Sequence, residues 1–215
     1  MSLEGKNRYL FSYSSKQLDN KKFQYKDFEK TKSYNSVFTK TDFIGTSFRA
    51  AQFKYCTFVD CNFIESDFVG TNFRGSKFIN CSFDNCLFQS TNCERTGFKD
   101  CTYNCCYLDG NRVDCFNCST GITIMDLKEI QSHIIPELEK EIENLRTNDF
   151  IRHSHTLHLK RNKINLVALF ILLQEYTQED LINLLPRISA HIDRNFYTIS
   201  YLKKLLKKAE KDAII

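Results

Sequence analysis

The sequence predicts a parallel β-helix followed by an all-helical domain, and three observations lead to this prediction. A phenylalanine recurs at every fifth position without a gap between residues 38 and 88. The residue two places before each of these phenylalanines is small. Near Gly121 the composition changes: Phe and Cys are abundant before this point, whereas Leu, Ile and Lys dominate after it.

A five-residue period excludes a straight helix or strand over this stretch. Residues five apart are displaced by about 140° around an α-helix and point to opposite faces of a β-strand. The chain must therefore bend once in each repeat, so that one large and one small residue point inward from each short extended segment. The predicted inward aromatic residues are Phe38, Phe43, Phe48, Phe53, Phe58, Phe63, Phe68, Phe73, Phe78, Phe83, Phe88 and, in a weaker continuation, Phe98.

This motif of small, polar, Phe and two variable residues resembles the pentapeptide repeat family over residues 23–118. The resemblance implies a right-handed, four-sided parallel β-helix with about 20 residues in each coil and about 5 coils over this stretch. Four sides rather than three follow from the resemblance, because the five-residue spacing alone hardly decides between them. Cys61, Cys81 and Cys101 recur at the spacing of one such coil, which gives weak additional support.

Three segments are predicted along the chain. Residues 1–22 show weak alternation and are expected to form a cap or strand over the first coil, since the exposed end of a β-helix must be covered. Residues 23–120 should form the β-helix, and residues 121–215 the helical domain.

Most of the ten cysteines fall on the small inward position, where a free thiol packs as a small apolar group. No signal peptide is recognised, so we expect a reducing, cytoplasmic environment. A straight column of thiols in a packed interior offers no tetrahedral ligand set for a metal. Cys105, Cys115 and Cys118 lie off the small position, and these thiols are expected to be the accessible ones.

The second half of the chain has a helical period. Apolar residues from Leu127 to Leu145 recur every three or four positions, and Pro136 should divide this helix or begin its second part. Residues 166–173 are apolar throughout and predict a buried helix, because spanning a bilayer takes about 20 residues. Thr177 with Asp180 is typical of a helix start. We expect three to five helices packed as a bundle.

The last predicted helix is amphipathic, with an apolar stripe inward and lysines on another side. The favoured interpretation of these lysines is an ordinary solvated face, and the alternative is contact with a partner, with nucleic acid or with an anionic membrane surface. The lysines concerned are Lys203, Lys204, Lys207 and Lys208.

Three histidines lie close together between two predicted helices: His153, His155 and His158. Zinc can bind three imidazoles and a water. However, the first two share a face only in extended chain, and the last two only in a helix. A solvated, pH-sensitive loop is the favoured interpretation.

The residue after each inward Phe should point outward at a corner of the coil. At this position Ile44 and Ile64 are one predicted coil apart, as are Val59 and Ile79, so that the two pairs should fall on adjoining faces. Exposed aliphatic patches mark interfaces more often than isolated apolar residues do. This aliphatic patch is predicted to contact the helical domain, a second subunit or a foreign protein.

Neither a catalytic residue nor a cofactor nor a metal is expected, because no phosphate-binding loop, metalloprotease helix or nucleophile elbow is present in the sequence. The favoured hypothesis is a non-enzymatic interaction or scaffold protein, with an unidentified protein partner and a possible homodimer. No transmembrane segment is expected. Members of the family that protect DNA gyrase from quinolones imitate DNA with an acidic surface, and this remains an alternative. Residues 36–118 carry a net charge of only −1, which weakens it.

Overall fold

The chain divides into two compact units, Met1–Ile124 and Met125–Ile215, and each is described by itself. The structure is a computed structural model. The structure describes residues 11–109, 116, 120–125, 127–159 and 163–213.

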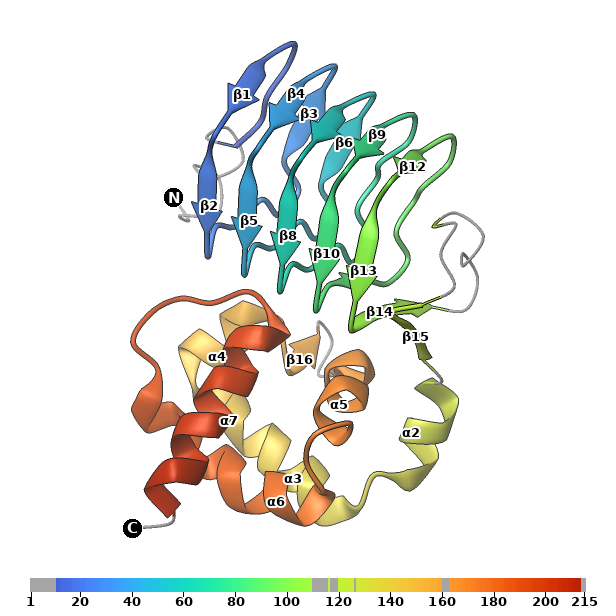
Figure 1. Cartoon of the computed structure of the whole chain (residues 1–215). Helices are drawn as coiled ribbons and strands as arrows, with labels where there is room; N and C mark the ends of the chain where they lie inside the picture. The colour runs from blue at the N-terminus through green and yellow to red at the C-terminus, as the bar shows by residue number, and fades with distance from the viewer. Residues whose placement is uncertain (1–10, 110–115, 117–119, 126, 160–162, 214–215) are drawn as a thin grey trace. The chain divides into compact units, whose positions relative to one another are not determined.

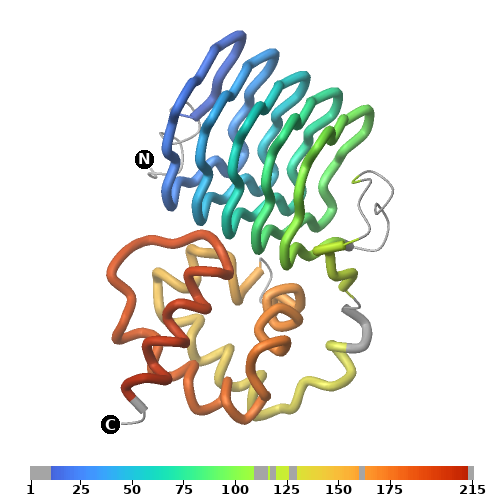
Figure 2. The backbone as a smooth tube through the Cα atoms, in the orientation of Figure 1, coloured from blue at the N-terminus to red at the C-terminus, as the bar shows by residue number. Residues whose placement is uncertain are grey.

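The first unit is a four-sided parallel β-helix, whose coils are visible as stacked ladders in Figure 1 and as a continuous tube in Figure 2. Each short strand pairs in parallel with the strand one coil later, and Phe38 lies opposite Phe58, which lies opposite Phe78. One coil therefore extends from Phe38 to Phe58, which is the predicted length, and two of its sides are sheets of five strands. The predicted solenoid of about 5 coils is confirmed.

Sides 1 and 2 are the two regular faces of the β-helix. Side 1 consists of β1 (Gln17–Asp19), β4 (Val37–Thr39), β7 (Thr57–Val59), β9 (Lys77–Ile79) and β12 (Gly97–Lys99). Side 2 consists of β2 (Lys22–Gln24), β5 (Asp42–Ile44), β8 (Asn62–Ile64), β10 (Ser82–Asp84) and β13 (Thr102–Asn104).

Sides 3 and 4 are held partly by single β-bridges between coils. Side 3 contains the bridged residues Asp27, Ser47, Asp67 and Leu87, with β11 (Leu87–Phe88), β14 (Cys106–Asp109) and β15 (Ile122–Met125). Side 4 contains β3 (Lys32–Tyr34), β6 (Gln52–Lys54) and the bridged residues Asn72 and Asn92.

The interior of the β-helix is a ladder of phenylalanine rings. From Phe38 to Phe88 every ring of the ladder is at most 1% exposed. Rings of successive coils stack on one another, with centroids 4.9 Å apart for Phe43 and Phe63. Phe98 and Cys101, which the sequence placed in the core, are only partly buried, because they belong to the coil that contains β12 and β13, the last strands of sides 1 and 2.

The corners of the coil lie one residue later than expected. The residue directly after each Phe ends a strand, and the next residue has a positive φ, for example 47° at Lys40 and 54° at Asp60. Two corners are glycines that lie under an aromatic ring of the preceding coil. A Cβ on Gly75 would lie 2.5 Å from the ring of Tyr55, so only glycine fits beneath that ring without a shift.

The first coil begins before Phe23. β1 pairs with β4, and Leu18 occupies the inward position with 8% exposure. Phe11 stacks on Phe28 with ring centroids 4.6 Å apart, and it covers the N-terminal end of the ladder. The described part of the expected cap therefore supplies both a coil and a covering ring.

The second unit is helical, as predicted, but within its described residues it contains more and shorter helices than expected. Its α-helices are α2 (Leu127–His133), α3 (Pro136–Asn144), α4 (Asp149–Ser154), α5 (Leu166–Leu173), α6 (Gln178–Leu184) and α7 (Ile199–Ala213). The 3₁₀-helices η2 (Leu145–Thr147) and η3 (Leu185–His191) and the antiparallel pair β16 (His158–Leu159) and β17 (Lys163–Ile164) complete it.

Local signals in the sequence fix several of these helix ends. Pro136 is the first residue of α3, as its missing N–H allows. Thr177 and Asp180 form a reciprocal capping box at the start of α6. α5 is largely buried, as predicted. No helix in the described part of the chain is long and apolar enough to cross a membrane.

Candidate interaction surface

The aliphatic patch consists of Ile44, Val59, Ile64 and Ile79, and it lies on two adjoining sides of the β-helix. Ile44 ends β5 and is paired with Ile64 at the end of β8 on side 2. Val59 ends β7 and is paired with Ile79 at the end of β9 on side 1. All four side chains are half-buried. The patch therefore lies along strand ends rather than at the corners where it was expected.

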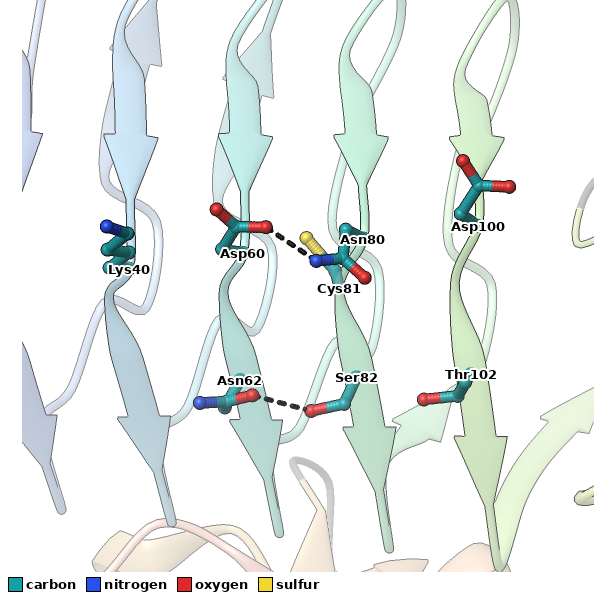
Figure 3. A pocket seen from close by; sticks show the side chains of 8 residues that line it. All are labelled: Lys40, Asp60, Asn62, Asn80, Cys81, Ser82, Asp100 and Thr102. Atoms are coloured by element: carbon teal, nitrogen blue, oxygen red, sulfur yellow. Dashed lines mark hydrogen bonds between the residues drawn. The ribbon is translucent and has the colours of Figure 1, made fainter.

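A polar hollow of about 370 Å³ lies at the corner between the two halves of the patch (Figure 3). Two rows of side chains line it, one from the corner residues after side 1 and one from the first strand residues of side 2. We call this feature the polar hollow. Its lining residues are Lys40, Asp60, Asn62, Asn80, Cys81, Ser82, Asp100 and Thr102.

Hydrogen bonds between successive coils hold the side chains of the hollow. Asn80 Nδ2 donates to Asp60 Oδ1 at 2.6 Å, and Ser82 Oγ donates to Asn62 Oδ1 at 2.8 Å. Asn62 Nδ2 also donates to Asp42 Oδ1 at 2.8 Å. Because neighbouring coils are about 4.8 Å apart, the hollow offers donors and acceptors at a regular spacing. Such an arrangement suits binding of a regular structure.

The polar hollow was not predicted, although the sequence contains a signal for it. Two sets of polar residues recur at the spacing of one coil. The first set is Lys40, Asp60, Asn80 and Asp100, and the second is Asn62, Ser82 and Thr102. Aligning the corner residues at the spacing of one coil shows that two polar columns separate the two aliphatic pairs.

The inward cysteines pack as the sequence predicted. Cys56, Cys61, Cys81 and Cys86 are buried free thiols, whereas Cys105 is exposed. Burial raises the pKa of the Cys56 thiol to about 11, and burial also raises the pKa of Cys86. Cys86 Sγ donates to the Phe63 carbonyl oxygen at 3.3 Å. Cys115 and Cys118 lie outside the described residues.

We expect a thiol reagent to label Cys105 in the native protein much faster than Cys56 or Cys86, by at least about 100-fold. The reactive species is the thiolate, and the buried thiols have both raised pKa values and no access. Quenched labelling followed by mass spectrometry of the peptides measures each rate. In denaturant all three rates should converge, which serves as the control. Equal native rates would contradict the packed coil.

The structure does not bring the three histidines together as a solvated loop or as a metal site. His153 is exposed in α4, His155 ends α4 in the left-handed conformation, and His158 is 1% exposed in β16. His158 Nε2 lies 2.8 Å from the Ile142 carbonyl oxygen. No group of three or more potential ligands among the described residues could hold a metal ion.

The buried His158 predicts a loss of stability in mild acid. Burial lowers the pKa of this imidazole below its usual 6.5, an effect that the nearby Arg146 reinforces and the Ile142 carbonyl and Glu143 oppose. The unfolded state therefore takes up the proton first. The stabilisation is complete above about pH 6.5 and falls as the pH drops below that value toward the folded-state pKa.

Urea unfolding followed by the helical circular dichroism signal, at several pH values between 7.5 and 5, measures this effect. His158→Gln keeps a donor for the Ile142 carbonyl but cannot titrate. We expect the decline of stability below pH 6.5 to be smaller in this variant. Equal decline in both proteins would show that other groups cause it.

The lysine face of α7 consists of Lys204, Lys207, Lys208 and Lys211, which are all exposed. Lys203, which the sequence grouped with them, is only half-buried and forms an ion pair with Glu175. The apolar stripe of the helix is buried, with Leu202, Leu205 and Leu206 at most 1% exposed.

Comparison with known proteins supports the β-helix assignment. The family model for pentapeptide repeats matches residues 34–68 and 66–102, with eight copies of the repeat. Residues 34–102 are pentapeptide repeats. These residues accordingly form a pentapeptide-repeat β-helix within the first unit. No curated protein matches the chain.

Solved structures of pentapeptide-repeat proteins resemble part of the chain. One is trypsin-treated QnrB1, a plasmid-mediated fluoroquinolone resistance protein, with 22% identity over 46% of this chain and a TM-score of 0.29. The match covers 52% of that protein, about half of its length. Another is Rfr23 from the cyanobacterium Cyanothece, with 12% identity over 51% of this chain and 92% of that one, and a TM-score of 0.19.

Proposed function

We propose that this protein is a non-catalytic scaffold whose pentapeptide-repeat β-helix binds a protein partner through the aliphatic patch and the polar hollow. The observation that carries the proposal is the arrangement of two aliphatic pairs on either side of a hydrogen-bonding hollow. An interface commonly combines an apolar area with polar groups that fix orientation.

A rigid surface suits this role. The strands and corners that present the patch are held by hydrogen bonds between coils, such as Gly45 N–H to the Ile64 carbonyl at 2.8 Å and Asp60 N–H to the Ile79 carbonyl at 3.0 Å. The surface therefore needs little ordering when a partner binds, which reduces the entropic cost of association.

Paired substitution of Ile64→Lys and Ile79→Lys tests the proposal. Neither side chain lies in the Phe ladder, so the coil should stay folded, while both charges would have to be desolvated on binding. We expect capture of the partner from the native host, quantified by mass spectrometry, to fall at least about tenfold, as for the loss of interface hot spots.

Val69→Lys is the matched control, because Val69 directly follows Phe68 and is half-buried, as Ile64 and Ile79 are, but lies on side 3. This variant should retain the captured protein. If the Ile64 and Ile79 substitutions leave capture unchanged while circular dichroism shows both variants folded, the aliphatic patch is not the binding surface.

The gyrase-directed alternative has less support. A DNA mimic needs a continuous acidic surface, but one corner column reads Lys40, Asp60, Asn80 and Asp100. The alternative of nucleic-acid or membrane contact through α7 rests on its exposed lysines, which Glu210 and Asp212 dilute.

A further inference from the structure

We propose that side 1 of the β-helix binds side 1 of a second copy of this chain, with the two coil axes antiparallel. Side 1 is the sheet of five strands from β1 to β12, and Figure 1 shows β1, β4, β9 and β12 in one row. This inference rests on the proposed function, because Val59 and Ile79 of the aliphatic patch lie on this side. It names the partner of that half of the patch.

The outward residues of side 1 form two columns, one from the first and one from the last residue of each strand. The parallel pairing of the strands fixes both columns. Neighbouring members of a column are about 4.8 Å apart. The first column is Gln17, Val37, Thr57, Lys77 and Gly97, and the second is Asp19, Thr39, Val59, Ile79 and Lys99.

The middle of side 1 is an apolar surface. The outward residues of β4 and β7, together with Ile79 of β9, are all β-branched and half-buried. Such side chains pack well on a pleated surface, and two sheets pack face to face about 10 Å apart. The ring of Tyr55 extends this surface, because it is 54% exposed at the corner where β7 begins and lies over Gly75.

The two ends of side 1 carry opposite charges. Asp19 lies on β1, and Lys77 and Lys99 lie on β9 and β12; all three are exposed. None of the ion pairs between described residues includes them. Asp19 accepts a hydrogen bond from the Asn20 amide at 2.8 Å, but this neutral donor leaves the negative charge in place.

An antiparallel arrangement makes side 1 complementary to itself. When β7 of one copy lies on β7 of the other, Asp19 is opposite the partner's Lys99 at both ends of the interface. In between, Val59 meets the partner's Val59, and Ile79 meets the methyl group of the partner's Thr39. A single two-fold axis along β7 relates all these contacts, as in an isologous dimer.

The charges exclude the parallel alternative. With the coil axes parallel, Asp19 would lie opposite the partner's Asp19 and Lys99 opposite the partner's Lys99, and like charges in such positions cost several kcal/mol. Within one chain, Asp19 and Lys99 are four coils or about 19 Å apart, so they do not neutralise each other. A second copy in the antiparallel orientation supplies the missing opposite charge at both ends.

Two features limit the strength of this contact. At the end of β7 the two Asp60 carboxylates approach each other near the two-fold axis, although the Asn80 amide donates to each of them at 2.6 Å. Side 1 is also small, since five strands cover only about 19 Å along the coil axis, and its interface is at the low end for a specific complex. We therefore expect a weak, reversible dimer.

Charge reversal at the ends of side 1 tests the arrangement in the full-length protein. We expect the parent to dimerise with increasing concentration in sedimentation velocity, and more weakly in higher salt. Asp19→Lys alone places a lysine opposite the partner's Lys99, and Lys99→Asp alone places two carboxylates opposite each other. Each variant should associate at least about tenfold more weakly than the parent.

Two recoveries identify the antiparallel pairing. The chain that carries both substitutions, and the equimolar mixture of the two single variants, should associate about as tightly as the parent, because each end again meets an opposite charge. In a parallel dimer neither single reversal would weaken association. Lys32→Asp, on side 4, is the control for a general effect of charge and should associate as the parent does.

A substitution on the two-fold axis tests the centre of the interface. Val59→Lys brings two ammonium groups together on the axis, so this variant should be monomeric at concentrations at which the parent is dimeric. Val69→Lys on side 3 is the matched control and should dimerise. Circular dichroism verifies that both variants are folded.

Three results would overturn the proposal: a parent that stays monomeric up to about 500 µM, association that neither single reversal weakens, or a mixture and a double variant that do not recover. Coverage of side 1 by the helical unit of the same chain would give the first of these. The proposed function fails by a different result, namely unchanged capture of a host protein by the Ile64 and Ile79 variant.

Discussion

Replacing Phe68 with alanine is expected to lower the free energy of unfolding of the β-helix by about 3–5 kcal/mol. The ring is fully buried, and it stacks between Phe48 and Phe88 with centroids 5.0 and 4.8 Å away. Hydrogen bonds between coils, such as Phe68 N–H to the Leu87 carbonyl at 2.8 Å, hold neighbouring coils at a fixed distance. The resulting cavity therefore cannot close by collapse. Urea unfolding followed by circular dichroism measures the loss.

Phe98→Ala provides the comparison for this prediction. Phe98 stacks on Phe78 at 4.9 Å but is only partly buried at the last strand of its side. Its removal should cost clearly less than the removal of Phe68. An unfolding midpoint for Phe68→Ala equal to that of the parent would contradict the idea that the ladder stabilises the fold.

The β-helix could be predicted because its geometry requires the same residue types at a fixed spacing in the sequence. Each side needs one large and one small inward residue. The large Phe68 is therefore followed five residues later by Phe73, and the small Ser66 by Thr71. The length of the coil, which the spacing alone could not decide, follows from the observed pairing of Phe63 with Phe83.

The corners were harder to place because only some of their residues give a turn signal. A left-handed corner favours Gly, Asn or Asp, yet Lys40 and Tyr55 occupy such positions with φ values of 47° and 55°. The repeat imposes this conformation, since hydrogen bonds to the next coil hold both residues. In the segment that was expected to form a cap or strand, Leu18 takes the place of the Phe, so the repeat shows in the sequence only from Phe23 onward.

In the helical unit the long periodic segments were predictable and the short ones were not. α7 spans 15 residues, enough to show a stripe, whereas α4 spans six and β16 two. His158 therefore looked like part of a loop, although the antiparallel pairing of His158 with Ile164 places it in a buried strand. The polar hollow was not predicted either, because its residues come from different coils and become neighbours only through the register of the coils.

Replacing Gly121 with alanine is expected to detach β15 from the end of the β-helix. Gly121 has a φ of 78°, and a Cβ at this position would lie 2.0 Å from the Tyr103 carbonyl oxygen and 2.6 Å from its carbon. Backbone atoms cannot move aside as a flexible side chain can. The alanine must also adopt a left-handed conformation, which costs about 1–2 kcal/mol by itself. We therefore expect a total cost of at least about 3 kcal/mol, near the upper end for single substitutions.

Hydrogen exchange can locate this effect, because the Cys106 N–H donates to the Gly121 carbonyl at 2.8 Å. In Gly121→Ala the Cys106 amide should lose its protection, while the Thr57 amide, which is bonded to the Ser36 carbonyl at 2.9 Å deep in the ladder, should keep its own. Gly97→Ala is the matched control, since a Cβ there meets nothing within 4 Å and the residue has no positive φ. Equal protection of Cys106 in both variants would mean that the chain can pass Tyr103 by another path, and that the close approach of Gly121 does not hold β15 in place.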